Sequence, residues 1–248
     1  MQTIQCAEVW GGIKNQDVDA CSRCLNVSLY SSACDGGRGG DVYYLSVCGY
    51  DRLTRVAIAD VAGHGESVSR ISDWLYQCLK ERMNDSDGAE VLRDLNHRIV
   101  ENDSGAITTA AVLGFYVDHD ETYYAYAGHP PAYVYNRGND EWRALQIGRG
   151  SAGLTNLPLG VDDTVTFDQA AAPFRSGDRM LLYTDGVLEA RSPNGEEFGS
   201  QRLYEVLQAA RDETLPRLKR RILSELVEFA GGGPLTHDDV TLLAAEMR

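Results

Sequence analysis

The sequence has few basic residues and no long apolar run. Only 23 lysines and arginines stand against 37 acidic residues, which leaves a formal net charge of −14. A field of that sign repels phosphate backbones and anionic lipids, so it argues against nucleic acid and membranes as partners. No stretch approaches the roughly 18 consecutive apolar residues that a bilayer-spanning helix needs. The start, MQTIQCAEVWGGIKNQD, lacks the basic end and apolar centre of a signal peptide, so a cytoplasmic location is expected.

The cysteines lack the pattern of a disulfide framework or of a complete zinc site. There are six of them: Cys6, Cys21, Cys24, Cys34, Cys48 and Cys78. A chain of 248 residues with 43% hydrophobic content can build an ample core without disulfides, so reduced thiols are expected. Cys21 and Cys24 have zinc-knuckle spacing, but no second CxxC and no histidine pair completes four ligands. Metal or redox use of this pair is therefore disfavoured.

The first half of the chain predicts strands followed by two helices. Segments 26–31, 42–48 and 55–60 are rich in β-branched and aromatic residues and are predicted to form an antiparallel meander. Apolar residues spaced by three or four predict a helix over 66–83, and a second one over 89–100 that begins near Asp87 or Gly88. The two helices are expected to form a hairpin.

The second half repeats this order of elements. Strands are expected at 106–117, 122–127, 132–135, 142–147, 180–184 and 239–245. Helices are expected near 200–210 and 216–229, the second with Thr214 as its N-cap and Pro216 in its first turn. This alternation of strands and helix pairs predicts one α+β domain, in which helices cover both outer faces of two antiparallel sheets.

Five short motifs, four of them acidic, follow one another along the chain. They are GGD at 39–41, ADVAGHG at 59–65, AGHPP at 127–131, TDG at 184–186 and HDDVT at 237–241. A single aspartate beside glycine usually marks a turn. Several of these aspartates, however, adjoin strand-like segments whose ends can converge at one end of a sheet. Carboxylates are the ligands that Mg²⁺ and Mn²⁺ prefer, and two such ions about 3.5–4 Å apart can promote phosphoryl transfer to water.

Six segments that include these motifs resemble a known family. They are GGDVYYL at 39–45, IADVAGHG at 58–65, YAGHPPAYV at 126–134, LPLG at 157–160, LLYTDGVLEA at 181–190 and DDVTLL at 238–243. In order and spacing they resemble the SpoIIE-like (RsbU-type) branch of the PPM, or phosphatase 2C-like, metal-dependent serine/threonine phosphatases. The resemblance implies a four-layer α-β-β-α sandwich with two central, mainly antiparallel sheets. It also implies two divalent cations, Mn²⁺ or Mg²⁺, at one end of the sheets.

The resemblance covers about residues 25–246 and implies a phosphatase domain at 25–248. Residues 1–24 are then an N-terminal extension that packs on or near the domain, with a sheet-edge cap and a homodimer interface both left open. Too few residues precede the resemblance for a sensory domain, so a separate activating protein is expected unless the enzyme is constitutive.

The activity implied is hydrolysis of phosphoserine or phosphothreonine on a regulatory protein by direct attack of metal-bound water, without a covalent phosphoenzyme. The substrate implied is an anti-anti-sigma factor or a similar small protein of a partner-switching pathway. Two alternatives stay open from the residues themselves. One is a phosphoprotein-binding adaptor of the same fold without turnover, and the other is a two-metal hydrolase of small phosphoesters.

The resemblance assigns roles to residues by position. Asp60 matches the bridging aspartate, and Val61 would offer its backbone carbonyl to a metal. Asp185 matches the ligand of the TDG motif and Asp41 the acidic ligand of the GGD motif. In the final motif Asp238 aligns best with the ligand and the next aspartate, Asp239, with its polar neighbour, which leaves an ambiguity of one residue.

The histidines and glycines of the motifs have more open roles. His64 stands where many members carry lysine, so a catalytic role as proton donor or phosphate contact and a loop-structuring role are equally open. His129 is expected to bond backbone within its turn rather than to act in catalysis. Gly63 and Gly65 would let the backbone approach the metals before the helix that starts at Glu66, although an ordinary glycine turn explains them as well.

Overall fold

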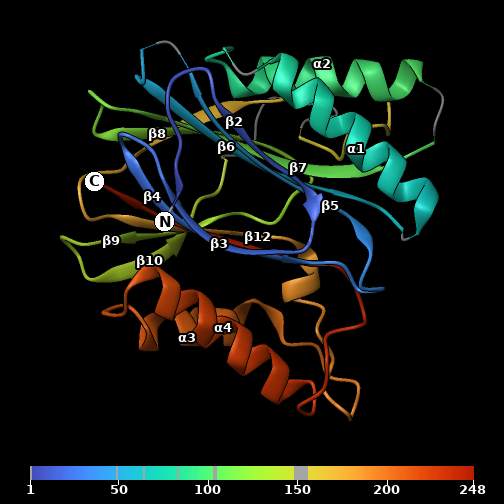
Figure 1. Ribbon diagram of the computed structural model, residues 1–248, viewed down its shortest axis with the longest axis vertical. Coiled ribbons are helices and arrows are strands. Elements are labelled where there is room, and N and C mark those ends of the chain that lie inside the picture. The colour runs from blue at the N-terminus through green and yellow to red at the C-terminus, as the bar shows by residue number, and fades with distance from the viewer. Residues whose placement is uncertain (1, 49, 64, 83, 103–104, 148–155) are drawn as a thin grey trace.

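Two β-sheets lie face to face in the computed structural model, and a pair of helices covers each outer face (Figure 1). The structure describes residues 2–48, 50–63, 65–82, 84–102, 105–147 and 156–248. Helices α1 (Glu66–Glu81) and α2 (Gly88–Glu101) cover one sheet, and α3 (Gly199–Ala209) and α4 (Leu215–Phe229) cover the other. The predicted α+β class and four-layer sandwich are confirmed. None of the helices in the described residues is long and apolar enough to cross a bilayer.

The first sheet has seven strands and carries α3 and α4. In spatial order they are β1 (Gln2–Thr3), β3 (Gln16–Cys21), β4 (Leu25–Ser32), β13 (Val240–Met247), β12 (Arg179–Tyr183), β9 (Tyr133–Asn136) and β10 (Glu141–Ala144). Every neighbouring pair is antiparallel except the short β1 and β3, which are parallel. The central pair, β13 and β12, comes from the last third of the chain: β12 leads directly into the TDG motif, and β13 leads out of the HDDVT motif.

The second sheet has six strands and carries α1 and α2. In spatial order they are β11 (Gln169–Pro173), β8 (Glu121–Ala127), β7 (Thr108–Tyr116), β6 (Leu53–Val61), β5 (Arg38–Cys48) and β2 (Val9–Lys14). All pairs are antiparallel, and β5 to β8 form a continuous meander. The strand β6 therefore lies near the middle of the sheet, with its end at the ADVAGHG motif.

The predicted meander of 26–31, 42–48 and 55–60 is wrong in its first strand. All three segments are strands, but β4 lies in the first sheet while β5 and β6 lie in the second. The connection between β4 and β5 crosses from one layer to the other, and it includes Gly36 at a φ of 75°. Period-two alternation identifies a strand but carries no information about which of two stacked sheets receives it, because both faces of these strands are buried.

The two helix pairs match their predicted ranges closely, whereas strands at the N-terminus and at 169–173 were not predicted. Residues 2–21 contribute β1 and β3 to the first sheet and β2 to the edge of the second. The segment thus joins both sheets at one side of the sandwich. Its sequence lacks the usual composition of a strand, because β2 contains Gly11 and Gly12 and β3 contains three acidic or amide residues.

Alternation along β6 shows how the layers are filled. Val56 and Ile58 pack in the core between the sheets, whereas Ala57 and Ala59 pack in the core under α1 and α2. Successive side chains of a strand point to opposite faces. Asp60 therefore belongs to the face that looks into the space between the sheets, at the very end of the strand. The same alternation holds in β12, which ends nearby, and in β5 and β13, which begin nearby.

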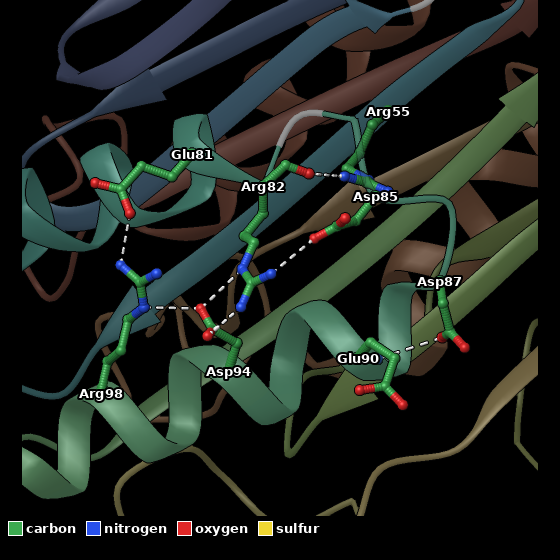
Figure 2. A network of polar contacts seen from close by, with 8 residues as sticks. All are labelled: Arg55, Glu81, Arg82, Asp85, Asp87, Glu90, Asp94 and Arg98. Carbon is green, nitrogen blue, oxygen red and sulfur yellow. Dashed lines mark hydrogen bonds and ion pairs between the residues drawn. The ribbon is translucent and has the colours of Figure 1, made fainter.

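A polar network joins the ends of α1 and α2 (Figure 2). Arg82, directly after α1, forms ion pairs with Asp94 in α2, and its carbonyl accepts a hydrogen bond from the buried Arg55 of β6. Arg98, also in α2, pairs with Asp94 within the helix at 2.8 Å and with Glu81 of α1 at 2.7 Å. These contacts fix the angle between the two helices and confirm the predicted helical hairpin.

Candidate metal centre

Asp41 and Asp60 lie directly opposite each other at the end of the second sheet. They are a registered pair between the antiparallel strands β5 and β6. Side chains opposite each other in such a pair have Cβ atoms about 4.5–5.5 Å apart, and like charges in this position destabilise a sheet. The pair is therefore unfavourable for the fold itself.

Asp41 connects the two sheets and is almost fully buried, with 3% of its surface exposed. Its Oδ2 accepts a hydrogen bond from Thr184 Oγ1 at 2.8 Å, and that hydroxyl oxygen accepts one from the Thr241 amide at 3.0 Å. Its Oδ1 is buried and has no hydrogen-bond partner within the described part of the chain. Burial and then the charge of Asp60 hold the pKa of Asp41 well above its usual range.

The Asp60 carboxyl is surrounded by carboxylates from the other motifs. Burial raises its pKa to about 8, followed by the charges of Asp185, Asp238 and Asp239 and a hydrogen bond with Asp185. The strongest electrostatic influences on Asp60 are thus all negative. Four motifs that are far apart in the sequence have been brought to one point, as the sequence predicted for the strand ends.

The TDG and HDDVT motifs meet as two neighbouring turns. Asp185 opens a short 3₁₀ turn (Asp185–Val187), and its carbonyl accepts the amides of Leu188 and Glu189 at 2.7 and 2.9 Å. His237 Nε2 lies 2.7 Å from the Gly186 carbonyl oxygen, so it joins one turn to the other. Both Asp185 and Asp238 remain half-buried, with room for their carboxylates to meet a ligand.

Glu189 is a nearby acidic residue that the sequence reasoning missed. Burial raises its pKa, and the charges of Asp185 and Asp238 come next among the causes. The sequence offered one signal for Glu189: it follows Asp185 by four residues, and residues four apart in a helical turn lie on the same side.

Asp239 differs from Asp238 in what its oxygens do. Only 5% of Asp239 is exposed. Its Oδ1 accepts the Cys34 amide at 2.8 Å and its Oδ2 accepts the Gly40 amide. The Asp239 amide in turn donates to Asp238 Oδ1 at 2.8 Å. Asp239 thereby ties the loop before β5 and the GGD motif to the start of β13.

The motif glycines are required by these close approaches. A Cβ on Gly39 would lie 2.3 Å from Asp239 Oδ2, and one on Gly186 would lie 1.9 Å from the Asp239 carbonyl oxygen. A Cβ on Gly40 would lie 2.7 Å from the Val61 carbonyl oxygen and 3.5 Å from Asp60 Oδ1. The carbonyl of Val61 and the Asp60 carboxylate therefore share the space above Gly40, and glycine keeps that space open.

The loop after β6 turns through two glycines in the left-handed region. Gly63 has a φ of 104° and Gly65 a φ of 94°, and α1 begins at Glu66 with Gly65 as its N-cap and no side-chain cap. A residue with a side chain is strained in both positions. His64, the candidate between them, lies outside the described residues.

His129 is buried, with 7% of its surface exposed. Its Nδ1 lies 3.0 Å from Thr109 Oγ1, and its buried Nε2 has no hydrogen-bond partner among the described residues. Burial lowers the pKa of His129 to about 4. The side chain thus joins the AGHPP turn to β7 through the Thr109 hydroxyl, and not to the backbone of its own turn as the sequence predicted.

The Cys21 and Cys24 thiols are buried in the sandwich. Cys24 Sγ lies 3.0 Å from Thr54 Oγ1, and Ser22, between the two cysteines, lies 2.8 Å from the same hydroxyl. All six cysteines are free thiols. This part of the sheet edge offers packing and hydroxyl contacts rather than a ligand set.

The donors at the centre suit hard divalent cations. They are carboxylate oxygens and one backbone carbonyl, the ligands that Mg²⁺ and Mn²⁺ favour. Among the described residues, no three histidine, cysteine or acidic side chains are grouped tightly enough to hold an ion by themselves. The buried, unpartnered Oδ1 of Asp41 and the mutual repulsion around Asp60 nevertheless need positive charge for compensation. The residues therefore fit a divalent cation site that uses pairs of carboxylates.

Comparison with known proteins agrees with this geometry. Residues 50–248 match the family model described as Stage II sporulation protein E (SpoIIE). Over 197 residues the chain is 26% identical to the phosphoserine phosphatase RsbP of Bacillus subtilis, covering 75% of this chain and 44% of RsbP. Protein IcfG of Synechocystis is 26% identical over 237 residues, which cover 83% of this chain and 35% of IcfG. The chain thus spans about a third to a half of these two relatives.

Solved structures show the same fold at lower identity. The RsbU and RsbW domains of a Mycobacterium tuberculosis protein superpose with a TM-score of 0.76 at 22% identity, covering 96% of this chain and 62% of that one. The SiaA-PP2C domain of Pseudomonas aeruginosa gives 0.76 at 20% identity, covering 90% and 86%. RsbX, solved in complex with magnesium, gives 0.67 at 16% identity, covering 94% and 100%. The fold is that of PPM phosphatase domains, and with the family model matching most of its length, the chain belongs to the SpoIIE family.

Proposed function

We propose that this chain is a metal-dependent protein serine/threonine phosphatase that hydrolyses phosphoserine or phosphothreonine on a regulatory protein. The observation that carries the proposal is the convergence of acidic residues from three other motifs on Asp60: Asp41 lies opposite it in the sheet, and Asp185, Asp238 and Asp239 act on it electrostatically. Such a cluster costs stability in an isolated fold, so it is explained best by a functional requirement for divalent cations. The phosphoserine phosphatase relatives supply the reaction class.

The proposed ligand set is the one that the family resemblance implies, and the cluster around Asp60 supports it. Asp60, Asp185 and Asp238 would hold the cations through their carboxylates, and Val61 would add its carbonyl oxygen. Asp41, buried beside Asp60, supports the site through its free Oδ1. When bound, two Mn²⁺ or Mg²⁺ ions supply an activated water and positive charge against the phosphoryl oxygens.

The chain's own residues then have three tasks. The carboxylates fix the position of the reacting group at the end of the sandwich. Because these carboxylates stand at the ends of strands, the geometry of the site is rigid. The glycines of the motifs leave room for a phosphoryl group to approach. The backbone amides at the start of α1 have no side-chain cap, and the helix dipole is positive at this end. The N-terminus of α1 therefore favours an anion beside the loop that follows β6.

Within the final motif we assign Asp238 as the ligand and Asp239 as a positioning residue. Both oxygens of Asp239 already accept backbone amides from Cys34 and Gly40. Asp238 is half-buried, and only its Oδ1 accepts an amide. A carboxylate with a free oxygen at the surface of the site is the better metal ligand, and its buried neighbour is the better structural clamp.

The regulatory protein is the finer part of the proposal. We propose an anti-anti-sigma factor or a similar small protein of a partner-switching pathway, and a separate activating protein, because the curated relatives RsbP and RsbU are phosphoserine phosphatases of the same family. We keep the proposed phosphatase domain at residues 25–248, to whose two sheets the preceding segment contributes the strands β1, β2 and β3. Whether β2 or β1 also meets a second copy is tested by measuring the oligomeric state.

The test is hydrolysis of a phosphoserine peptide and of p-nitrophenyl phosphate with Mn²⁺, with EDTA, and with the Asp185→Ala variant. Hydrolysis that needs Mn²⁺ and is lost by at least about a hundredfold in the variant supports the proposal, since a metal ligand contributes to the transition state directly. Binding of the phosphopeptide without turnover would instead identify an adaptor. Turnover of p-nitrophenyl phosphate but not of phosphopeptides would identify a hydrolase of small esters.

A further inference from the structure

A row of three polar side chains closes one end of the core between the sheets. Asp41 of β5 lies opposite Asp60 of β6, and Asp60 lies opposite Thr109 of β7. Residues opposite each other in antiparallel strands point to the same face of the sheet, with Cβ atoms about 4.5–5.5 Å apart. Tyr43 and Ala111, two residues farther along β5 and β7, pack in the core between the sheets, so the row faces the same space. Thr109 therefore flanks Asp60 on the side away from Asp41.

The Thr109 hydroxyl is held by a buried histidine. Thr109 Oγ1 lies 3.0 Å from His129 Nδ1, and only 7% of His129 is exposed. The two residues meet because Ala110 of β7 forms a bridge with Gly128, which brings the AGHPP turn alongside the strand. Thr109 itself is only half-buried. The pair thus reaches from an enclosed ring to the partly open end of the sheet, where Asp60 lies.

The stability of the fold does not explain a histidine at this position. Its second ring nitrogen, Nε2, is buried without a hydrogen-bond partner in the described part of the chain. A buried polar atom without a partner costs stability, so an apolar side chain of similar size would pack here at lower cost. What His129 offers that an apolar side chain cannot is the hydrogen bond between its Nδ1 and Thr109.

A second carboxylate of the row is supported in the same way. Thr184 Oγ1 donates to Asp41 Oδ2 at 2.8 Å, and the hydroxyl oxygen is itself held by a backbone amide of β13 at 3.0 Å. A hydroxyl that is fixed by a further group thus orients this carboxylate. Carboxylates that bind metals are generally oriented by such hydrogen bonds, and loss of the partner typically lowers metal affinity by about 10–100-fold. Thr109, fixed by His129, stands in the corresponding place beside Asp60.

We infer that His129 is a positioning residue that acts through Thr109 on the carboxylate of Asp60. The hydrogen bond of His129 selects the rotamer of Thr109 and keeps its hydroxyl in place beside Asp60, so that this carboxylate is held ready for a divalent cation. In this role His129 contacts neither a cation nor a phosphoryl group. The inference rests on the proposed metal centre and adds the layer of residues that supports it.

The experiment measures Mn²⁺ binding to the metal-free full chain by isothermal titration calorimetry, which needs no turnover. Thr109→Val removes the hydroxyl and keeps the shape of the side chain, so it is expected to weaken Mn²⁺ binding by about tenfold. Thr109→Ser keeps the hydroxyl and should restore the affinity. Thr108→Val is the matched control, because Thr108 points to the opposite face of β7 and its buried hydroxyl has no partner among the described residues. It should leave Mn²⁺ binding unchanged.

His129 is tested by variants that differ in the position of one polar atom. His129→Asn places an amide near the position of Nδ1 and should keep the Mn²⁺ affinity, whereas His129→Leu should weaken it about as much as Thr109→Val. Combining His129→Leu with Thr109→Val should weaken binding no further, because the two residues act in series. Urea unfolding in EDTA shows whether each variant folds. If the leucine variant does not fold, His129→Gln, whose amide lies near the position of Nε2, takes its place.

The outcomes separate this inference from the function on which it rests. Mn²⁺ binding that survives Thr109→Val, or losses that add up in the double variant, overturn the positioning role alone, since His129 would then serve only the fold of its turn. Equal losses in the asparagine variant and in the leucine or glutamine variant also overturn it. A wild-type chain that binds no Mn²⁺ overturns the metal centre and the inference together. Mn²⁺ binding with the expected pattern but without hydrolysis of any phosphoester supports the inference and overturns the phosphatase function.

Discussion

Replacing Asp60 by asparagine should make the metal-free protein more stable, although it removes a residue at the heart of the site. Burial and the charges of Asp185, Asp238 and Asp239 raise the pKa of Asp60 from its usual 3.8 to about 8. Above pH 8 the ionised carboxylate therefore destabilises the metal-free fold, by several kcal/mol at most, since each pKa unit corresponds to about 1.4 kcal/mol. Asparagine removes the charge but remains a buried polar group, so we expect it to recover about half, 2–3 kcal/mol.

The pH dependence has a defined sign. The folded state holds its proton on Asp60 more tightly than the unfolded state, so the free energy of unfolding of the metal-free wild type should fall as the pH rises from about 4 to about 8. Below pH 4 the carboxyl is protonated in both states and the contribution vanishes. Asp60→Asn should show a shallower fall over this range, because the other carboxylates still contribute.

Urea or thermal unfolding in EDTA at several pH values measures this difference. At pH 8 the variant should melt about 5–10 °C above the wild type, since each kcal/mol is worth about 2–4 °C in a chain of this size. Added Mn²⁺ should reverse the order, because it stabilises the wild type by binding and the variant much less. Asp118→Asn, which removes an exposed carboxylate paired with Arg52 at the surface, serves as the control and should change stability by less than about 0.5 kcal/mol.

A variant that is less stable than the wild type in EDTA at pH 8 would refute the reasoning, since Asp60 would then be making a favourable interaction. A difference between the two proteins that is the same at pH 5 and pH 8 would also refute it, because the effect would not come from charge.

Two further predictions concern residues that hold the site and the helix pair. Asp239→Asn keeps only one acceptor oxygen for two backbone amides, so it should lower the free energy of unfolding in EDTA by about 2–3 kcal/mol. Asp238→Asn should leave the free energy of unfolding unchanged or raise it. Urea titration measures both variants, and equal effects would contradict the separate roles of the two aspartates. Asp94→Ala removes the acceptor shared by two arginines between α1 and α2 and should cost about 1–2 kcal/mol, measured by thermal unfolding.

Several parts of the site could be read from local sequence because they depend on neighbours in the chain. The strands that end at Asp60 and at Thr184 have clear apolar alternation, and the acidic motifs stand where those strands stop. The helices α1 and α2 were placed within a few residues by their apolar spacing and by Asp87, which accepts the amides of Ala89 and Glu90 at the start of α2. Local patterns of this kind survive folding because they determine which face is buried.

Other features depended on contacts between distant parts of the chain. The meander prediction failed at β4 because the choice between two stacked sheets depends on how the whole core packs, and the N-terminal strands escaped notice because their pairing with β4 and β5 outweighs weak local propensity. Likewise, sequence alone could not separate Asp238 from Asp239. Two adjacent aspartates look alike in a motif, and only the amides of Cys34 and Gly40, some 200 residues earlier, make one of them a clamp.

The sequence by itself determined the family, the order of the elements and the identity of the acidic residues, because these are carried by short motifs and by the periodicity of apolar side chains. The tertiary structure alone decided that Asp41 faces Asp60 across a strand pair and that four motifs share one electrostatic environment. The physical reason is that charge coupling and cavities depend on distances in space, and these are set by the packing of two sheets rather than by spacing along the chain.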